Sequence, residues 1–205
     1  MRWFYIFARS VTWFIFTVMY DISYENVENI PQNRGGYISA CNHVKYLDPL
    51  MVAFKQKQWI RYMGKAELHN IKGLGWLFRW LGSIKVERGT GDMSAIDKCV
   101  DIINDGGIIG IFPEGTRYPI GQPGRPKSGM ALIAKMTKAD ILPCAVTYEQ
   151  PFKLRSKVTV KYGKLIPYAE LGLDDDSPRA LKKATKRVWG DILELLGMGD
   201  NNEEQ

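Results

Sequence analysis

The chain has 205 residues, of which 45% are hydrophobic and 24% are charged, so its composition is that of an ordinary globular domain with a substantial core. The net charge of +6 favours anionic partners: phosphate-bearing small molecules, acidic lipid headgroups or nucleic acid. The cysteines, Cys41, Cys99 and Cys144, are widely spaced and include no C-x-x-C pair. This argues against a disulfide framework or a zinc site and favours a reducing compartment.

The first predicted element is a helix over residues 3–20, whose only charge is Arg9. The segment lacks the uninterrupted apolar centre of a signal peptide, and its length is marginal for a membrane-spanning helix. A helical projection places a basic polar half opposite a wide apolar half, which is typical of a helix lying in a membrane interface. The polar half holds Arg2, Arg9, Ser10, Thr12 and Thr17, and the apolar half holds Trp3, Phe4, Phe7, Val11, Phe14, Ile15 and Val18. The alternative is a helix packed on the domain's own core.

From residue 20 onward, segments with strand character alternate with segments of helical spacing. We expect strands at residues 20–27, 36–42, 58–65, 83–89, 108–117 (running into a loop), 141–148 and 157–163. We expect helices at residues 48–56, 66–82 with glycine interruptions, 94–105, 128–139 and 177–197. This alternation predicts an α/β fold with a mixed, partly parallel sheet flanked by helices. The expected organisation is a membrane-associating helix over 1–20, one domain over 21–198 and a disordered acidic tail over 199–205.

Candidate functional residues gather where the predicted strands end. In layered α/β domains the active site lies at the loops that leave the strand ends. His43, Lys65, Arg88 and Glu114 each follow or close a predicted strand. This convergence predicts a functional site at one edge of the sheet, assembled from loops that are far apart in the sequence.

The stretch NHVKYLDP contains His43 and Asp48. A lone histidine at a strand end is usually structural, and an aspartate before a proline is typical of a helix N-cap. A catalytic role for the pair is compatible with helix capping by Asp48. One carboxylate oxygen can cap the helix while the other accepts a hydrogen bond from His43 Nδ1. That bond would leave Nε2 as a base, as in the histidine–aspartate half of a serine protease triad. The chain has no G-x-S-x-G elbow and Cys41 is only a parallel neighbour of His43, so we expect a substrate hydroxyl to be the nucleophile.

The stretch FPEGTR follows a buried strand and runs into a loop. Gly115 permits a close approach of the backbone to a ligand, and the planar fork of Arg117 suits a phosphate group. Arg88, which ends SIKVER, adds a second arginine at a strand end. The alternative is that Glu114 and Arg117 form a surface ion pair and that Arg88 is a solvated charge.

Four blocks occur in the order NHVKYLD, GSIKVERG, FPEGTR and ILPCAV. In order and spacing they resemble the motifs of the 1-acylglycerol-3-phosphate acyltransferases of the glycerolipid acyltransferase superfamily, over about residues 20–170. The resemblance implies transfer of a fatty acyl group from acyl-carrier protein or coenzyme A to the sn-2 hydroxyl of lysophosphatidic acid, giving phosphatidic acid. No metal or other cofactor is implied, because the thioester donor is already activated.

The resemblance also implies roles for residues at matching positions. His43 corresponds to the general base and Asp48 to the residue that orients it. Arg88 and Arg117 correspond to the ligands of the acceptor phosphate, with Lys65 near the site. The other residues of the expected substrate site are Glu114, Gly115 and Thr116, which position the glycerol, and the further candidate Lys127.

The chain departs from the family pattern in three places. Many family members have more hydrophobic N-terminal helices than the single one here. Lys45 stands where serine is common, which adds positive charge beside the site. The loop over residues 118–129 lacks the S-R-D-G run of many relatives. Lys45 lies within the His43 block but leaves His43 and Asp48 in place, and the altered loop bears on the acceptor.

Lysophosphatidic acid and its product live in bilayers, so we expect a peripheral or monotopic protein on the cytoplasmic face of the cell membrane. WLFRWLG, with Trp76, Phe78 and Trp80, is a second interfacial patch or, alternatively, ordinary core. The open functional alternatives are transfer to another lysolipid or to glycerol-3-phosphate, a thioesterase-like hydrolase, and a non-catalytic protein that binds anionic lipid. Nucleic acid is not an expected partner, because no recognition fingerprint occurs and acidic residues are interleaved with basic ones.

Overall fold

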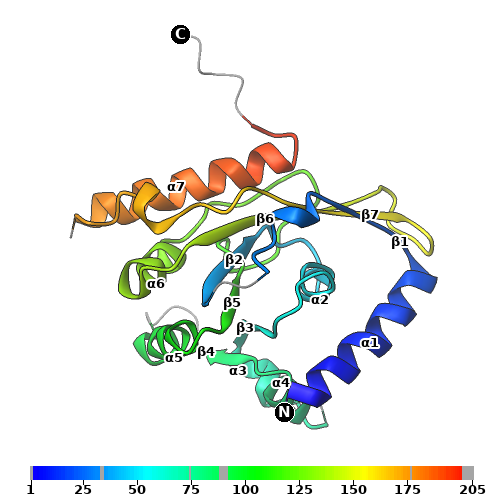
Figure 1. Cartoon of the computed structure of the whole chain (residues 1–205). Helices are drawn as coiled ribbons and strands as arrows, with labels where there is room; N and C mark the ends of the chain where they lie inside the picture. Colours follow the sequence, from blue (N-terminus) through cyan, green and yellow to red (C-terminus); the bar gives the residue numbers. More distant parts are fainter. Residues whose placement is uncertain (1, 33–34, 74, 88–91, 176, 200–205) are drawn as a thin grey trace.

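The structure is a computed structural model that describes residues 2–32, 35–73, 75–87, 92–175 and 177–199. In these residues a seven-stranded sheet has the order β1-β7-β6-β2-β5-β3-β4, and helices lie around it (Figure 1). The strands are β1 (Asp21–Glu25), β2 (Tyr37–Cys41), β3 (Ile60–Lys65), β4 (Ile84–Val86), β5 (Ile108–Ile111), β6 (Ile141–Tyr148) and β7 (Lys157–Tyr162).

The helices include two long ones, at the two ends of the described chain. They are α1 (Arg2–Met19), α2 (Asp48–Ala53), α3 (Ala66–His69), α4 (Gly75–Trp80), α5 (Met93–Asn104), α6 (Gly129–Thr137) and α7 (Pro178–Leu195), with 3-10 turns η1 (Val27–Asn29) and η2 (Tyr168–Glu170). None of the helices in the described residues has the length and apolarity needed to cross a membrane.

The sheet is mixed, as predicted. The pairs β2–β5, β2–β6, β3–β5 and β3–β4 are parallel, whereas β6 and β7 are antiparallel, and β1 runs parallel to β7. The carboxyl ends of β2, β3, β4, β5 and β6 therefore meet at one edge, where an α/β domain places its active site. The predicted fold class is confirmed.

Alternate residues of β2 enter two separate cores, since successive side chains of a strand point to opposite faces. Ile38 and Ala40 pack with residues of α5, α6 and α7, whereas Tyr37 and Cys41 pack with α2. All five residues of β2 are buried, as expected for a central strand covered by helices on both faces. The strand that delivers His43 is thus held rigidly in the middle of the molecule.

Several predicted boundaries shift. The stretch 66–82 divides into α3 and α4, and Gly73, in the divide, has a φ of +82°, which glycine adopts without strain. The strand predicted for 83–89 ends at Val86, and the strand predicted for 20–27 ends at Glu25, before η1. Arg88 and residues 200–205 of the tail predicted for 199–205 lie outside the described residues.

Helix α1 lies at the edge of the domain (Figure 1). One side of the helix contacts the domain and, among the described residues, the other side does not. On the contacting side Arg9 Nη1 donates to the Gln56 carbonyl oxygen over 2.5 Å, and the Trp13 ring packs edge-on against Phe54 with 5.2 Å between the ring centres. The predicted polar half thus supplies part of the contact with the domain. The large apolar side chains on the other side are exposed: Trp3, Ile6, Phe7, Val11, Phe14, Ile15 and Val18.

Candidate active site

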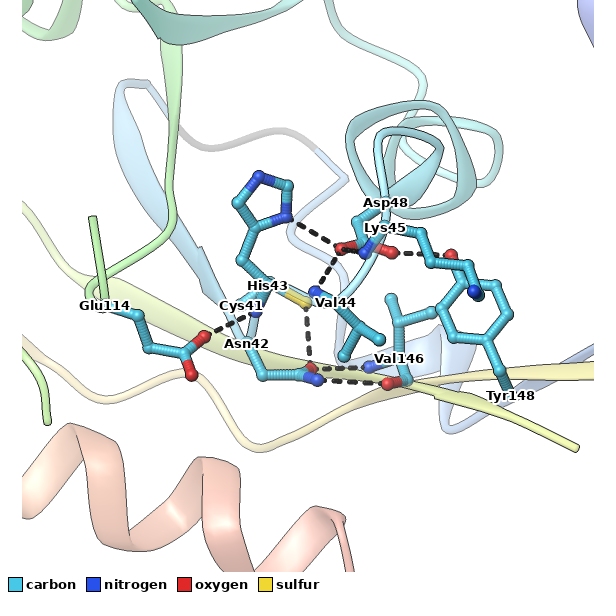
Figure 2. A network of polar contacts seen from close by, with 9 residues as sticks. All are labelled: Cys41, Asn42, His43, Val44, Lys45, Asp48, Glu114, Val146 and Tyr148. Carbon is cyan, nitrogen blue, oxygen red and sulfur yellow. Dashed lines mark hydrogen bonds and ion pairs between the residues drawn. The ribbon is translucent and has the colours of Figure 1, made fainter. Parts of the chain in front are cut away.

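His43 is positioned by Asn42, the residue that follows β2. The Asn42 carboxamide is buried, donates to the Val146 carbonyl over 3.0 Å and accepts the Val146 N–H over 2.8 Å (Figure 2). Val146 lies beyond Cys144, the last residue of β6 that pairs with β2. The Asn42 side chain thereby satisfies both the N–H and the carbonyl group of Val146. The backbone leading into His43 is consequently tied to the centre of the sheet.

The His43 ring is bonded to Asp48, as the sequence predicts. Nδ1 lies 2.8 Å from Asp48 Oδ2, and the Asp48 side chain is completely buried. The same oxygen accepts the N–H groups of Val44, over 2.7 Å, and Lys45, over 2.8 Å. Since a carboxylate is only an acceptor, Nδ1 carries the proton and Nε2 presents a lone pair.

The predicted helix-capping role of Asp48 is wrong. Asp48 is the first residue of α2 rather than its N-cap, which is Leu47, and no side chain caps this helix. The Asp48 carboxylate turns back to the loop that precedes the helix, where the N–H groups of Val44 and Lys45 approach one oxygen together with His43. Its acceptor capacity is therefore used to shape the loop around His43.

The second Asp48 oxygen, Oδ1, accepts a hydrogen bond from the Tyr148 hydroxyl at the end of β6. Tyr148 is buried, and burial followed by the charge of Asp48 raises the pKa of its hydroxyl, which therefore remains a donor. The Lys45 ammonium lies 5.5 Å from the centre of this ring and 4.4 Å from that of Phe152. Sequence reasoning missed Tyr148, because no motif marks a residue 100 positions from Asp48.

Two groups of the FPEGTR region hold the His43 backbone. Glu114 Oε2 accepts the His43 N–H over 2.6 Å, and the Tyr118 N–H donates to the His43 carbonyl over 2.9 Å. Glu114 Oε1 accepts the Gly124 N–H over 2.7 Å. Burial raises the pKa of the Glu114 carboxyl, and these hydrogen bonds oppose the shift. Glu114 is only 2% exposed, so the alternative of a surface pair with Arg117 is wrong.

Aromatic rings fix the plane of the His43 ring. Phe112 stacks on it with 4.1 Å between the ring centres, and Tyr62 stacks on the other side of Phe112 at 5.6 Å. Phe112 is the first residue of FPEGTR, which sequence reasoning considered only for its polar members. The stack and the Nδ1 bond together leave Nε2 as the reactive atom, without a hydrogen-bond partner among the described residues.

The expected phosphate ligands lie after neighbouring parallel strands. Arg117, in the loop after β5, is exposed, and its guanidinium carbon is 3.4 Å from the centre of the Tyr46 ring. Lys65, the last residue of β3, forms an exposed ion pair of 2.8 Å with Glu67. The structure therefore brings Arg117 and Lys65 to one edge of the sheet; Arg88 lies outside the described residues.

Gly115 and Lys127 meet beneath the FPEGTR loop. Gly115 has a φ of +70°, and a Cβ atom built on it would lie 3.1 Å from Lys127 Nζ. The positive φ favours glycine at this position, and a larger residue would also make the Lys127 side chain shift by a few tenths of an ångström. Thr116 is exposed beside it. Lys127 also donates its backbone N–H to the Pro113 carbonyl over 2.8 Å, which closes the loop.

A cleft of about 100 Å³ opens beside His43. Its lining includes His43, Glu114 and Tyr148 and is otherwise largely apolar. The apolar residues come from the segments after β2, FPEGTR and α7, and include Val44, Pro119, Ile120, Pro123, Leu196 and Met198. A cleft that combines a few polar groups with an apolar lining suits a substrate with a polar group and a hydrocarbon chain.

The family model described as Acyltransferase matches residues 21–147, more than half of the chain. This protein belongs to the acyltransferase family. The 1-acyl-sn-glycerol-3-phosphate acyltransferase of Streptococcus pneumoniae is 32% identical to it over 180 residues, covering 83% of this chain and 65% of the relative. The enzyme of that name from Bacillus subtilis is 30% identical, covering 78% of each chain. The resemblance stated from the four sequence blocks is therefore confirmed.

A solved structure shares the fold of this acyltransferase. The 1-acyl-sn-glycerophosphate acyltransferase of Thermotoga maritima superposes with a TM-score of 0.65 and 23% sequence identity. The match covers 86% of this chain and 72% of the other. At this identity the likeness shows that the two proteins have the same architecture.

Cys41 lies close to the candidate site around His43, but its thiol is buried. Its sulfur is buried 3.5 Å from Asn42 Oδ1, and burial raises the pKa of the thiol well above its usual range. A protonated, buried thiol is a poor nucleophile. Within the described residues no group of three or more His, Cys, Asp and Glu side chains is arranged to hold a metal ion.

Proposed function

We propose that this acyltransferase transfers a fatty acyl group from an acyl-carrier protein or coenzyme A thioester to the sn-2 hydroxyl of 1-acylglycerol-3-phosphate, giving phosphatidic acid. The observation that carries the proposal is the His43–Asp48 pair, in which Nδ1 is bonded to the buried carboxylate and Nε2 has no hydrogen-bond partner among the described residues. The names of the curated relatives supply the acceptor class.

His43 is the general base. Its Nε2 takes the proton of the acceptor hydroxyl while the hydroxyl oxygen attacks the thioester carbonyl. The carbon–sulfur bond then breaks, and the leaving thiolate takes the proton back from the imidazolium. The buried Asp48 carboxylate, 2.8 Å from Nδ1, stabilises the imidazolium between these steps. The substrate hydroxyl is the nucleophile, so the enzyme forms no covalent intermediate.

Tyr148 and Glu114 are positioning residues in this proposal. Tyr148 holds one oxygen of Asp48 so that the other faces His43, and Glu114 holds the His43 N–H. The buried Glu114 carboxylate accepts the backbone N–H groups of His43 and Gly124, and these two hydrogen bonds hold the glycerol-positioning loop in place. Gly115 and Thr116 then offer the surface of that loop to the glycerol.

Arg117, Lys65 and Arg88 bind the acceptor phosphate in this proposal. A phosphate monoester carries about −1.5 to −2 charges at pH 7 and requires cationic partners. The Tyr46 ring lies against the face of the Arg117 guanidinium, which leaves the N–H groups at its edge for a two-pronged contact with phosphate oxygens.

The exposed apolar side of α1 is the proposed contact with the membrane. Its tryptophan and phenylalanine side chains continue onto α4, where Phe4 meets Trp80 with 5.1 Å between ring centres and Trp76 with 6.3 Å. Trp76 and Trp80 are themselves exposed. These exposed aromatic residues support a peripheral or monotopic protein whose α1 lies in the membrane interface, and the location that we propose is the cytoplasmic face of the cell membrane.

The test is a transfer assay with purified protein, labelled acyl thioesters on both carriers, and a panel of lysolipids and glycerol-3-phosphate. Wild-type protein is expected to form labelled phosphatidic acid from lysophosphatidic acid. His43→Ala is expected to lower the rate by about 10²–10⁴-fold, the usual contribution of a general base. Free fatty acid released without an acceptor would instead identify a thioesterase, and near-wild-type turnover by a folded His43→Ala protein would remove His43 from the mechanism.

Two further variants test the roles of the residues around the His43–Asp48 pair. Tyr148→Phe removes only the hydroxyl and is expected to lower kcat by less than His43→Ala while leaving KM unchanged, because it acts through Asp48. Cys41→Ser is expected to retain activity. An acyl group found on Cys41 by mass spectrometry, with loss of activity in Cys41→Ser, would replace direct transfer by a covalent route.

A further inference from the structure

A second hollow, of about 560 Å³, lies away from His43 and shares no residue with the cleft described above. It is formed where α3, α4, β4 and α5 meet (Figure 1). Each of three elements contributes one cation to its wall: α4 supplies Arg79, β4 supplies Lys85 and α5 supplies Lys98. Ile84 and Ile102 add an apolar part to the lining.

The positive charge in the lining of this hollow exceeds the negative charge. Asp101 is the one acidic side chain in the lining, against three cations, and none of Arg79, Lys85 and Lys98 forms an ion pair within the described residues. An excess of cations on a concave wall attracts anions. The hollow is therefore shaped and charged to receive an anion.

His69 lies close enough to these cations to respond to their charge. It is buried in the wall of the hollow, with Nε2 3.2 Å from Ser83 Oγ. Burial lowers the pKa of the His69 imidazole, and the positive charges of Arg79 and Lys85 lower it further. The charge of the two cations is thus felt at the wall itself.

We propose that this hollow binds a phosphate group, at a site separate from the one that we assign to the acceptor of the acyl group. Phosphate fits because the Arg79 guanidinium offers a planar fork and the two lysines offer mobile point charges. Ser83 and His69 are neutral polar groups that can complete the hydrogen bonding. Ile84 and Ile102 would contact the apolar part of the molecule that carries the phosphate.

The phosphate can belong to a soluble molecule or to a lipid headgroup. Arg79 lies on α4 between Trp76 and Trp80, whose rings contact Phe4 of α1. The hollow therefore lies next to the apolar surface that we assign to the membrane. A headgroup bound there would hold α4 at the bilayer, whereas a soluble phosphate would bind without any membrane.

Histidine signals in NMR spectra can test the proposal directly, because the chain has only two histidines. His43→Ala removes one signal and so assigns the other to His69. Titration with inorganic phosphate is expected to move the His69 signal in a saturable way and to raise the His69 pKa, because a bound anion offsets the charges of Arg79 and Lys85. The readout does not depend on acyl transfer, so it stands or fails separately from the proposed reaction.

The double variant Arg79→Gln/Lys98→Gln is expected to weaken phosphate binding at least about tenfold, since a hydrogen bond to a charged group contributes a factor of roughly 10 to 150. All substituted side chains are exposed, and melting temperatures verify that the variants fold. The matched control is Lys182→Gln/Lys183→Gln on α7, which removes two exposed charges outside the hollow and is expected to leave the affinity unchanged. Equal affinity in both double variants, or an unmoved His69 signal, would overturn the proposal.

Bicelles distinguish the two sources of phosphate. Phosphatidylcholine bicelles containing phosphatidic acid and inorganic phosphate are each titrated over the same range of phosphate concentration. A His69 response at lower concentration with the bicelles identifies a lipid headgroup, and a response to inorganic phosphate alone identifies a soluble ligand. Either response must be lost in Arg79→Gln/Lys98→Gln; a response that persists there would also overturn the proposal.

Discussion

Helices α1 and α7 have the same length, 18 residues, and both have an apolar side, but those sides meet different surroundings. Helix α7 buries Ala184, Val188 and Ile192 in the core that it shares with α5 and α6, and it exposes lysines and arginines. Helix α1 exposes its apolar side, including Trp3 at 68% and Phe14 at 69%, and contacts the domain with Arg9 and other residues of the opposite side.

The difference shows that amphipathicity predicts a helix but not what covers its apolar side. The buried face of α7 meets neighbouring helices and strands of its own domain, so its burial contributes to the free energy of folding. The exposed face of α1 meets no such partner among the described residues, and in our proposal it meets lipid. Apolar side chains on α7 should therefore affect stability, whereas those on α1 should affect membrane binding.

The largest expected difference comes from one substitution made in both helices. Ile192→Ala, at a completely buried position of α7, is expected to lower the free energy of unfolding by about 2–5 kcal/mol, through lost burial and the cavity that remains. Ile15→Ala, at a position of α1 that is 45% exposed, is expected to change it by less than about 0.5 kcal/mol. Urea denaturation of both variants measures the two values. A similar loss in both would show that α1 packs as tightly as α7.

A smaller effect is expected in membrane binding. Burying a phenylalanine side chain contributes about 1.5–3 kcal/mol, so Phe14→Ser should weaken binding to anionic vesicles by roughly 10- to 150-fold without lowering the melting temperature. Met136→Ser, at an exposed position of α6 on the other side of the sheet, is the control and should bind as wild type. Vesicle co-sedimentation provides the measurement. Equal binding by both variants would exclude the exposed side of α1 as the membrane contact.

The smallest effect concerns the ends of the helices. Ser177 is the N-cap of α7, and its hydroxyl accepts the Ala180 N–H over 3.2 Å. Ser177→Ala is expected to cost about 1 kcal/mol of stability, the usual contribution of a serine cap. Ser10→Ala in α1 removes a hydroxyl that bonds only to the Ile6 carbonyl of its own helix, and should cost less than about 0.5 kcal/mol. Thermal unfolding measures the loss of stability in both variants. An equal loss in Ser177→Ala and Ser10→Ala would show that the Ser177 cap does not contribute the expected stability.

The amino-acid sequence by itself determined the fold class and the proposed base. Alternating strand and helix patterns sufficed for a mixed sheet, because the spacing of apolar residues is a local property of each segment. His43 and Asp48 are five residues apart on either side of one tight loop, so their contact also follows from local chain geometry. The amphipathic character of α1 and α7 was predictable for the same reason.

Only the tertiary structure decided how the pair is completed. Tyr148 reaches Asp48 across 100 residues, Asn42 reaches Val146 across 104, and Glu114 reaches the His43 backbone across 71. Such contacts depend on which strands are neighbours and in which register, and no local pattern specifies either. The error at Asp48 has a local cause: the N–H groups of Val44 and Lys45, in the loop before α2, bond to the carboxylate that was expected to cap the helix. The exposed side of α1 again depends on the tertiary structure, since the surface that a helix leaves uncovered is decided by where the rest of the chain ends up.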